Sequence, residues 1–193
     1  MLQEREAGSK TRMREASDED LMARVAMADA AAFRMLCDRH AARTVGFARR
    51  FVGDAHDAED IAQEALLRVW RAAPRWRPTA AFGTWFYRIV VNLCLNHRRK
   101  ARFLPLDTAG EAIDPAPDAL ARIEHREDDV GLWAAVADLP ERQRAAILLT
   151  YWEGLSNARV ADILGTSVSG VETLLVRARR SLRGRLGPHD KGA

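Results

Sequence analysis

The sequence predicts an all-α protein made of two small helical domains joined by a flexible acidic linker. Apolar residues recur at helical spacing through most of the chain, and no stretch shows the alternation typical of a β-strand. A proline-containing acidic segment interrupts the helical pattern beyond the middle of the chain. The length of 193 residues suits one or two small domains, and 48% apolar residues are enough to form their cores.

The first domain is expected over residues 17–102, after a polar, frayed tail over residues 1–16. Ser17 or Asp18 can cap its first helix, because both side chains accept hydrogen bonds from free backbone N–H groups. Further helices are expected over about residues 30–51, 58–71 and 81–101, separated by the turn signals Gly53-Asp54 and Ala73-Pro74.

The linker is expected over residues 103–128, where Pro105, Pro115 and Pro117 accompany most of the acidic excess. A second domain is expected over residues 129–186, followed by a short tail over residues 187–193. In the second domain, Pro140 suits the first turn of a helix over residues 141–152. Gly154 is expected to end that helix, and Ser156 can cap the next one.

Residues 157–180 carry the pattern of a helix-turn-helix, the motif that places a helix in the major groove of DNA. The small Ala161 lets two helices approach closely, and Val171 fills the space between them. Gly165 lies at the turn, where glycine tolerates a positive φ. Ser169, Glu172, Thr173, Arg177 and Arg180 are the candidate DNA contacts on the second helix.

The charge distribution supports contact with nucleic acid more than the net charge of +3 does. Basic residues gather in two clusters, one on each side of the acidic segment, which suggests a nucleic-acid contact on each domain. The alternative interpretation is that each cluster is a solvated helix end. The clusters are Arg98, Arg99, Lys100 and Arg102, and Arg177, Arg179, Arg180, Arg183 and Arg185.

The helix over residues 58–71 carries a polar face besides the apolar face that packs inward. Asp60, Gln63, Glu64 and Leu67 share this face at spacings of three and four residues. Two carboxylates beside an exposed leucine can form a docking surface for a basic partner. An ordinary solvated face would show the same pattern, so both interpretations stay open at this point.

Aromatic residues gather around the start of the helix over residues 81–101. Trp76, Phe82, Trp85 and Phe86 can stack on unpaired bases, or they can fill the core, an interpretation favoured for Phe82 and Phe86. Polar side chains of the loop and of one helix flank can hold phosphates or bases. They are Arg77, Thr79, Arg88, Asn92, Asn96 and Arg99.

Several other classes of protein are disfavoured by the sequence. Cys37 and Cys94 lie in apolar helical contexts typical of free thiols, and no second pair joins Cys94 and His97 in a metal site. We therefore expect no metal, no cofactor and no catalytic residue. No apolar run is long enough to cross a bilayer, and the charged N-terminus lacks a signal core, so a cytoplasmic location is expected.

Four motifs occur in an order that resembles the extracytoplasmic function sigma factors of bacterial RNA polymerase. They are DAEDIAQEALLRVW over 57–70, FGTWFYRIVVN over 82–92, LPERQRAAILL over 139–149 and the terminal helix-turn-helix. The resemblance covers about residues 17–186. It implies that the first domain is sigma region 2, which binds core polymerase and the −10 element, and that the second is sigma region 4, which reads the −35 element.

The resemblance also implies roles for particular positions. Asp60, Gln63, Glu64 and Leu67 match the surface that docks on the largest polymerase subunit. The loop from Trp76 to Gly83 matches the segment that captures a flipped −10 base, and the linker matches the segment that threads toward the active centre. The family often has basic residues at the positions of Glu172 and Leu174, so the −35 sequence cannot be carried over to this chain.

The resemblance implies three partners: core polymerase through its β and β′ subunits, promoter DNA, and an anti-sigma factor that sequesters the protein. A conventional helix-turn-helix regulator, which binds duplex DNA by itself, is the main alternative. It explains the second domain but not the polar face at residues 60–67 or the aromatic cluster. An enzyme acting on nucleic acid is disfavoured, since no nucleophile–base arrangement is evident.

Overall fold

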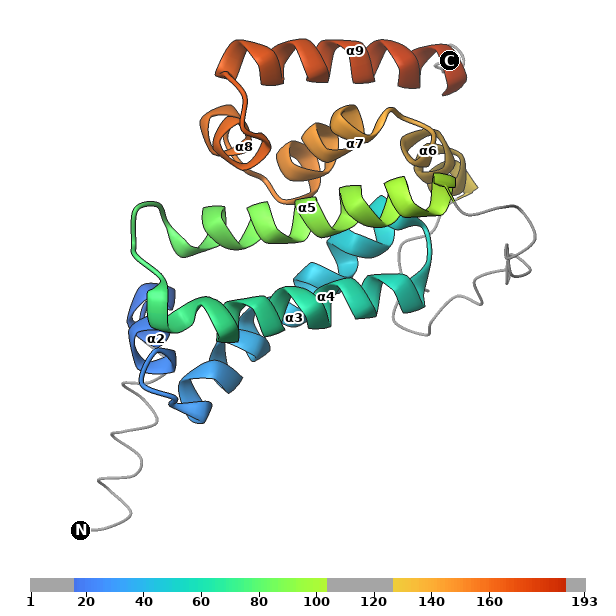
Figure 1. Cartoon of the computed structure of the whole chain (residues 1–193). Coiled ribbons are helices and arrows are strands. Elements are labelled where there is room, and N and C mark those ends of the chain that lie inside the picture. Colours follow the sequence, from blue (N-terminus) through green and yellow to red (C-terminus); the bar gives the residue numbers. More distant parts are fainter. Residues whose placement is uncertain (1–15, 104–126, 187–193) are drawn as a thin grey trace.

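The computed structural model describes residues 16–103 and 127–186, and these residues form helices and turns with no strand among them (Figure 1). This confirms the all-α prediction. Residues 16–103, here called the first domain, contain α2 (Asp18–Val25), α3 (Ala30–Val52), α4 (Ala55–Ala72), the 3₁₀ turn η1 (Ala73–Arg75) and α5 (Phe82–Phe103). Residues 127–186, the second domain, contain α6 (Glu127–Ala137), α7 (Glu141–Ile147), the π-helical turn η4 (Leu148–Trp152), α8 (Asn157–Leu164) and α9 (Val168–Leu186).

Side-chain caps determine where the helices of the first domain begin. Ser17, not Asp18, caps α2, and it forms a reciprocal capping box with Asp20. Asp29 caps α3. Asp54 caps α4, so this helix begins three residues before the expected residue 58. The apolar pattern could not locate that start, because the first turn of α4 is exposed.

Aromatic side chains form the centre of the first domain. Phe47 and Phe51 of α3 are fully buried, and the Phe47 ring packs edge to face on Tyr87 of α5, where Phe82 and Phe86 are buried as well. The rings of Phe82 and Phe86 stack with centroids 5.7 Å apart. This packing fixes α5 against α3 and α4, so that only one flank of α5 can face outward.

The second domain confirms the predicted turns and changes one helix. Gly154 and Gly165 have φ values of +66° and +59°, which favour glycine over residues with a side chain. Ser156 caps α8 as expected. The helix expected over residues 141–152 is present, but its second half is the π-helical turn η4, closed by a hydrogen bond from the Glu153 N–H to the Leu148 carbonyl.

The expected linker lies largely outside the described residues, and both of its borders shift. The helix α5 continues to Phe103, and α6 begins at Glu127, so neither residue 103 nor residues 127–128 belong to an unstructured connection. The predicted tails over residues 1–16 and 187–193 also fall on the undescribed part of the chain, except for Ala16.

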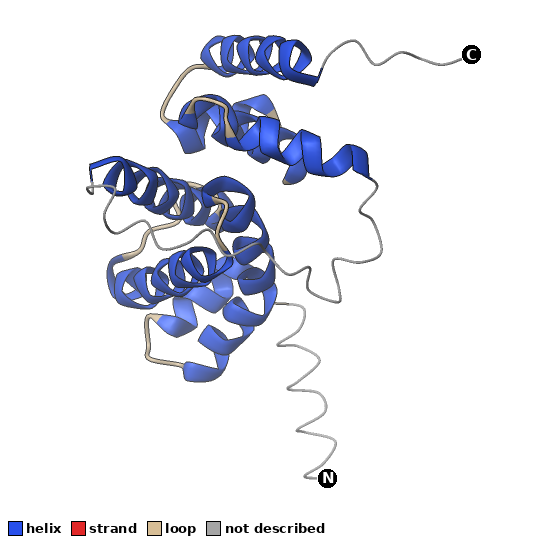
Figure 2. Ribbon diagram, turned by 90° about the vertical axis from the view of Figure 1, so that its right-hand side faces the viewer, coloured by secondary structure: helices blue, strands red, loops and turns tan. Residues whose placement is uncertain are grey.

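The two domains pack directly on each other. The helix α8 lies against α5, while α6 and η4 lie against α3 (Figure 1). Figure 2 shows the second domain stacked on the first, with α9 on the far side. In the part of the chain that the structure describes, no helix is long and apolar enough to span a membrane.

Candidate nucleic-acid interface

The polar face of α4 is exposed, as its pattern predicts. Asp60 and Gln63 are exposed, and 38% of the surface of Leu67 is accessible. Glu64 is half-buried and paired: the Arg68 Nε donates to its Oε1 over 2.8 Å, and an Arg71 nitrogen lies 3.9 Å from its Oε2. The hydrogen bond from Arg68 holds the pKa of Glu64 below its usual range. The four residues therefore form one accessible surface with a fixed negative charge.

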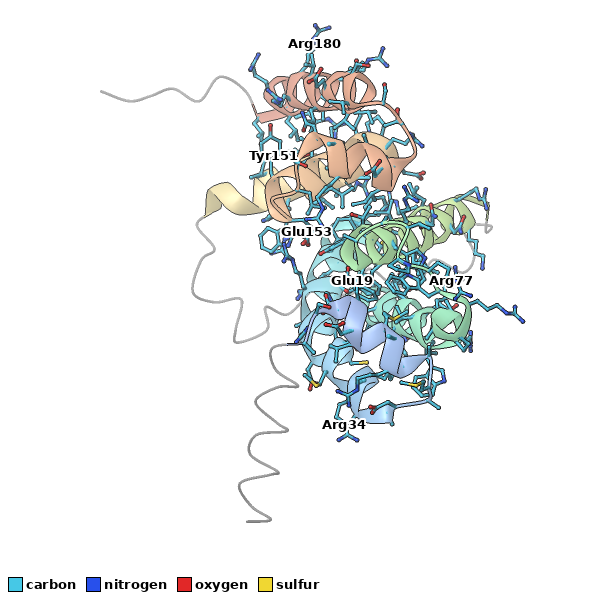
Figure 3. The ribbon with its side chains drawn as sticks, turned by 90° about the vertical axis from the view of Figure 1, so that its left-hand side faces the viewer. Glu19, Arg34, Arg77, Tyr151, Glu153 and Arg180 are labelled. Atoms are coloured by element: carbon cyan, nitrogen blue, oxygen red, sulfur yellow. The ribbon has the colours of Figure 1, made fainter. Side chains whose placement is uncertain are left out.

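Two tryptophans meet at the start of α5. The Trp76 and Trp85 rings pack edge to face with centroids 6.0 Å apart, and both residues are half-buried. The Trp76 indole N–H is enclosed and has no hydrogen-bond partner among the described residues. Arg77 and Thr79 are exposed beside them, and Figure 3 shows Arg77 extending away from the protein. The Arg77 Nη1 donates to the Trp76 backbone carbonyl over 3.2 Å, so the loop presents the aromatic pair next to an exposed guanidinium that is held by the loop backbone.

Phe82 does not belong to this surface. Only 1% of its area is accessible, and its ring packs on Phe86 and on the His40 imidazole. Of its two interpretations, stacking on bases and filling the core, the structure supports the core, so Phe82 leaves the set of candidate DNA contacts. Phe82 lies four residues before Phe86 in α5, so both side chains point to the same buried face of the helix.

The polar flank of α5 is present, but one of its members is already engaged. Arg88, Asn92, Asn96 and Arg99 are exposed. An Arg99 Nη2 donates to the Asn96 side-chain oxygen over 3.1 Å. The Arg88 Nε donates over 2.7 Å to the backbone carbonyl of Asp162, which lies in α8 of the second domain. The flank can therefore contact DNA over its full length only if Arg88 leaves α8.

Sequence analysis missed the residue that fixes the start of α5. Glu19 of α2 accepts a hydrogen bond from the Phe82 N–H over 2.7 Å. A carboxylate there also complements the positive end of the helix dipole. Nearby, the His40 ring that packs on Phe82 lies 2.8 Å from the Asp18 carboxylate, and this hydrogen bond lowers the pKa of Asp18. The two hydrogen bonds join residues 63 and 22 positions apart, so no local pattern signals them.

The helix-turn-helix has the geometry that its spacing predicts. Ala161 and Val171 are buried between α8 and α9, and Gly165 makes the left-handed turn. Leu174 packs against the core. All five candidate DNA contacts of α9 are exposed, and Figure 3 shows Arg180 pointing outward: Ser169, Glu172, Thr173, Arg177 and Arg180.

A second surface on the second domain was not predicted. An apolar groove of about 250 Å³ lies between α6, η4 and α9. Tyr151 and Trp152 line it and remain 60% and 45% exposed. Arg179 supplies the one charged side chain of the lining. The signal was present in the sequence, because two adjacent aromatics in η4 cannot both face the interior of a helical domain.

Both cysteines are free thiols. Cys94 is buried in the first domain, and burial raises its pKa to about 12. Cys37 is half-buried, and burial, followed by the nearby Asp38 carboxylate, raises its pKa. Neither thiol has the lowered pKa typical of a reactive cysteine.

Comparison with known proteins places both domains in described families. Residues 36–103 match the family model of sigma-70 region 2, and residues 130–182 match that of sigma-70 region 4. The chain is 33% identical to the RNA polymerase sigma-H factor of Pseudomonas aeruginosa, over 89% of this chain and 94% of that protein. It is 35% identical to the ECF RNA polymerase sigma factor SigM of Mycobacterium tuberculosis, over 92% of this chain and 89% of that protein.

A solved structure shares the arrangement as well as the sequence. The structure of CnrH in complex with the cytosolic domain of CnrY is 27% identical and has a TM-score of 0.66. The alignment covers 88% of this chain and 96% of that one. The similarity therefore includes both domains.

Proposed function

This chain belongs to the extracytoplasmic function sigma factors of bacterial RNA polymerase. On that basis we propose which of its surfaces bind core polymerase and which bind promoter DNA. The first domain binds core polymerase and reads the −10 element, and the second reads the −35 element. The observation that carries this proposal is the pair of exposed polar helix faces, one on α5 and one on α9, each in a different domain. The protein acts with the cytoplasmic polymerase and has no catalytic residue of its own.

We propose that the Trp76–Trp85 pair captures an unpaired base of the −10 element. Opening a duplex costs a few kcal/mol for each unstacked base, and stacking on an aromatic ring returns about 1–3 kcal/mol. Arg77, Thr79 and the polar flank of α5 then hold the backbone of the opened strand. The unpartnered Trp76 N–H can donate to that base or to its phosphate once the loop adjusts.

For the −35 element, Thr173, Arg177 and Arg180 are the proposed principal contacts in the major groove, with Ser169 at the start of α9. Arginine is suited to guanine and to phosphate. Glu172 is exposed on the same helix and can accept a hydrogen bond from the amino group of cytosine. A carboxylate at that position rejects phosphates, so it directs the helix toward particular bases.

We propose that the exposed face of α4 docks on the β′ subunit and that the apolar groove of the second domain receives an apolar segment of the β subunit. Gln63→Ala combined with Glu64→Ala should weaken binding to core polymerase without unfolding, since neither side chain belongs to the buried core. Asp38→Ala is the matched control, because it removes an exposed carboxylate from α3 instead. Equal affinity of both variants for core in a titration would contradict the assignment of this face.

The similar CnrH was solved in complex with another protein, the cytosolic domain of CnrY, and we propose that this chain is likewise bound by a partner, an anti-sigma factor. We propose that such a protein sequesters this chain by covering the surfaces that contact polymerase. The Gln63→Ala, Glu64→Ala variant tests this too, since a sequestering protein that covers the α4 face should lose affinity together with core polymerase.

The decisive test is transcription from purified components. Core polymerase with this protein should start transcripts at defined sites on genomic fragments, and mapping those sites would give both promoter elements. A conventional helix-turn-helix regulator would instead protect duplex DNA by itself. Protection by the protein alone, together with no transcript in the presence of core, would contradict the proposal.

A further inference from the structure

We propose that α2 is a positioning element for the loop that joins Trp76 to Trp85. Two neighbouring carboxylates of α2, those of Asp18 and Glu19, hold Phe82, and Phe82 in turn sets the relative position of the two tryptophans. The matched range of sigma-70 region 2 begins at residue 36, so α2 lies outside it. The capture of a −10 base by the tryptophans rests on the proposed function, but the positioning itself does not.

The helix α2 contacts both ends of this loop. The turn η1 ends at Arg75, directly before Trp76, and α5 begins at Phe82. The helix α2 packs against both of these elements (Figure 1). Leu21 and Met22 of α2 are fully buried, so this helix is anchored in the core of the first domain. A helix that is anchored in this way can restrict the loop without belonging to it.

Glu19 supplies a cap that α5 lacks in its own sequence. The helices α2, α3 and α4 are each capped by the side chain of the residue that precedes them. The residue before α5 is Ala81, whose methyl group cannot accept a hydrogen bond. The Glu19 Oε1 accepts from the Phe82 N–H over 2.7 Å instead, and Figure 3 shows Glu19 where α2 approaches α5. The first turn of α5 is therefore fixed by a different helix.

Asp18 holds the same phenylalanine through the imidazole of His40. The His40 Nε2 lies 2.8 Å from the Asp18 carboxylate, which also accepts a hydrogen bond from Arg39 over 2.7 Å. The centre of the His40 ring lies 5.2 Å from that of Phe82 and 5.5 Å from that of Phe86. Because Asp18 fixes the imidazole and the imidazole packs on Phe82, α2 holds both the backbone and the ring of Phe82.

Phe82 contacts both tryptophans, so its position affects theirs. The centre of its ring lies 6.5 Å from that of Trp76 and 5.8 Å from that of Trp85. With the tryptophans 6.0 Å apart, the three rings form one packed cluster, in which Phe82 is buried and both tryptophans are half-buried. A displaced Phe82 would change the angle and spacing of the tryptophans, and stacking on a base depends on that geometry.

Hydrogen–deuterium exchange of the full chain tests the positioning without DNA. Glu19→Ala removes the acceptor for the Phe82 N–H, so peptides that cover residues 76–86 should exchange about tenfold faster. Glu19→Gln keeps an acceptor and should stay close to the wild type. Asp38→Ala is the matched control, because it removes an exposed carboxylate from α3, and it should leave these peptides unchanged. Peptides from α4 and from the second domain should keep their wild-type rates in every variant.

A double-mutant cycle with Trp76→Leu tests whether the positioning matters for binding. Fluorescence anisotropy measures the affinity of the full chain for a random-sequence single-stranded oligonucleotide. Glu19→Ala should lower this affinity about fivefold in the wild type, a part of what one stacked base contributes. In the Trp76→Leu background the same change should lower it by about twofold or less, since the aromatic pair is already lost. Glu19→Gln removes the same negative charge, so its comparison with Glu19→Ala separates the hydrogen bond from the charge.

Unchanged exchange over residues 76–86 in Glu19→Ala would overturn the positioning. Faster exchange throughout the first domain would overturn it as well, because Glu19 would then serve only general stability. Equal losses of affinity in both backgrounds would also contradict it, since Glu19 would act independently of Trp76. If Trp76→Leu alone leaves the affinity unchanged while Glu19→Ala loosens residues 76–86, the positioning holds and the proposed capture of an unpaired base fails.

Discussion

The helices α5 and α9 are both assigned to promoter DNA, yet they are built into the protein in different ways. The first carries a large part of the core of its domain, with Phe82, Phe86 and Val90 buried along its length, and α8 contacts its exposed flank. In α9, the buried residues Val171, Leu175 and Ala178 form a narrow stripe, Leu174 and Leu182 pack beside it, and the side with the candidate DNA contacts is exposed.

This difference means that the two helices would recognise DNA under different structural constraints. In α5, the proposed DNA contacts alternate with residues that hold the domain together, so a change of specificity there carries a risk to stability. In α9, the proposed DNA contacts are exposed and make few contacts within the protein, so they can change without affecting the fold. The predictions that follow test this contrast.

The largest effect is expected from Phe86→Ala in α5. Removing a fully buried phenylalanine should cost about 3–5 kcal/mol of unfolding free energy, a large part of the 5–15 kcal/mol typical of a domain. Val176→Ala in α9 is the comparison, because this valine is 53% exposed. It should change stability by no more than about 0.5 kcal/mol. Urea denaturation followed by circular dichroism measures both, and equal effects would remove the contrast.

The next effect concerns the entry to α9, the one place where this helix is closely constrained. A Cβ on Gly170 would lie 2.4 Å from the Thr166 hydroxyl, whereas a Cβ on Gly184 would meet nothing within 4 Å. Gly170→Ala should therefore cost about 1–3 kcal/mol, the usual penalty for overpacking. Gly184→Ala, within the same helix, should gain up to about 1 kcal/mol. If α9 is constrained only at its start, the midpoint of thermal unfolding should fall for Gly170→Ala and rise for Gly184→Ala.

A smaller effect is expected where α5 depends on another element. Glu19→Ala removes the acceptor for the Phe82 N–H and should cost about 0.5–2 kcal/mol, as loss of a helix cap does. Glu19→Gln keeps an acceptor without its charge and should cost less. Single-strand DNA binding should weaken in the same order, since the cap positions the Trp76–Trp85 loop. If DNA binding were unchanged while stability fell, Glu19 would have no positioning role.

The smallest effect is a pH dependence of the first domain. The hydrogen bond from His40, opposed by burial and assisted by Arg39, lowers the pKa of Asp18 in the folded state. A lowered pKa contributes stability that is present above the ordinary aspartate value and is lost as the pH falls through the folded value. Asp18→Asn should flatten the fall in stability below about pH 4. Parallel pH profiles of variant and wild type would contradict this expectation.

The sequence predicts what depends on near neighbours along the chain. The left-handed turn at Gly165, the caps at Ser17 and Ser156, and the exposed faces of α4 and α9 all follow from residues within one or two helical turns. The all-α fold follows from the same periodicity.

Contacts between distant residues were not predictable in this way. The cap that Glu19 provides for α5 and the buried position of Glu153 depend on how helices pack, and each residue looks like an ordinary surface glutamate in the sequence. Phe82 was kept among the candidate DNA contacts because aromatics surround it, although the core was its favoured position, and its register with Phe86 places it there. Function and packing use the same residue types at this site, so composition alone cannot separate them.

The π-helical turn η4 has a consequence for how such a protein could arise. A π turn holds one residue more than an α turn, and one residue corresponds to a rotation of about 100° around a helix axis. Deleting one residue from Leu148–Trp152 would restore a regular helix and turn Glu153 away from Arg43 and Tyr87. A single codon therefore decides whether Glu153 of the second domain reaches Arg43 and Tyr87 of the first.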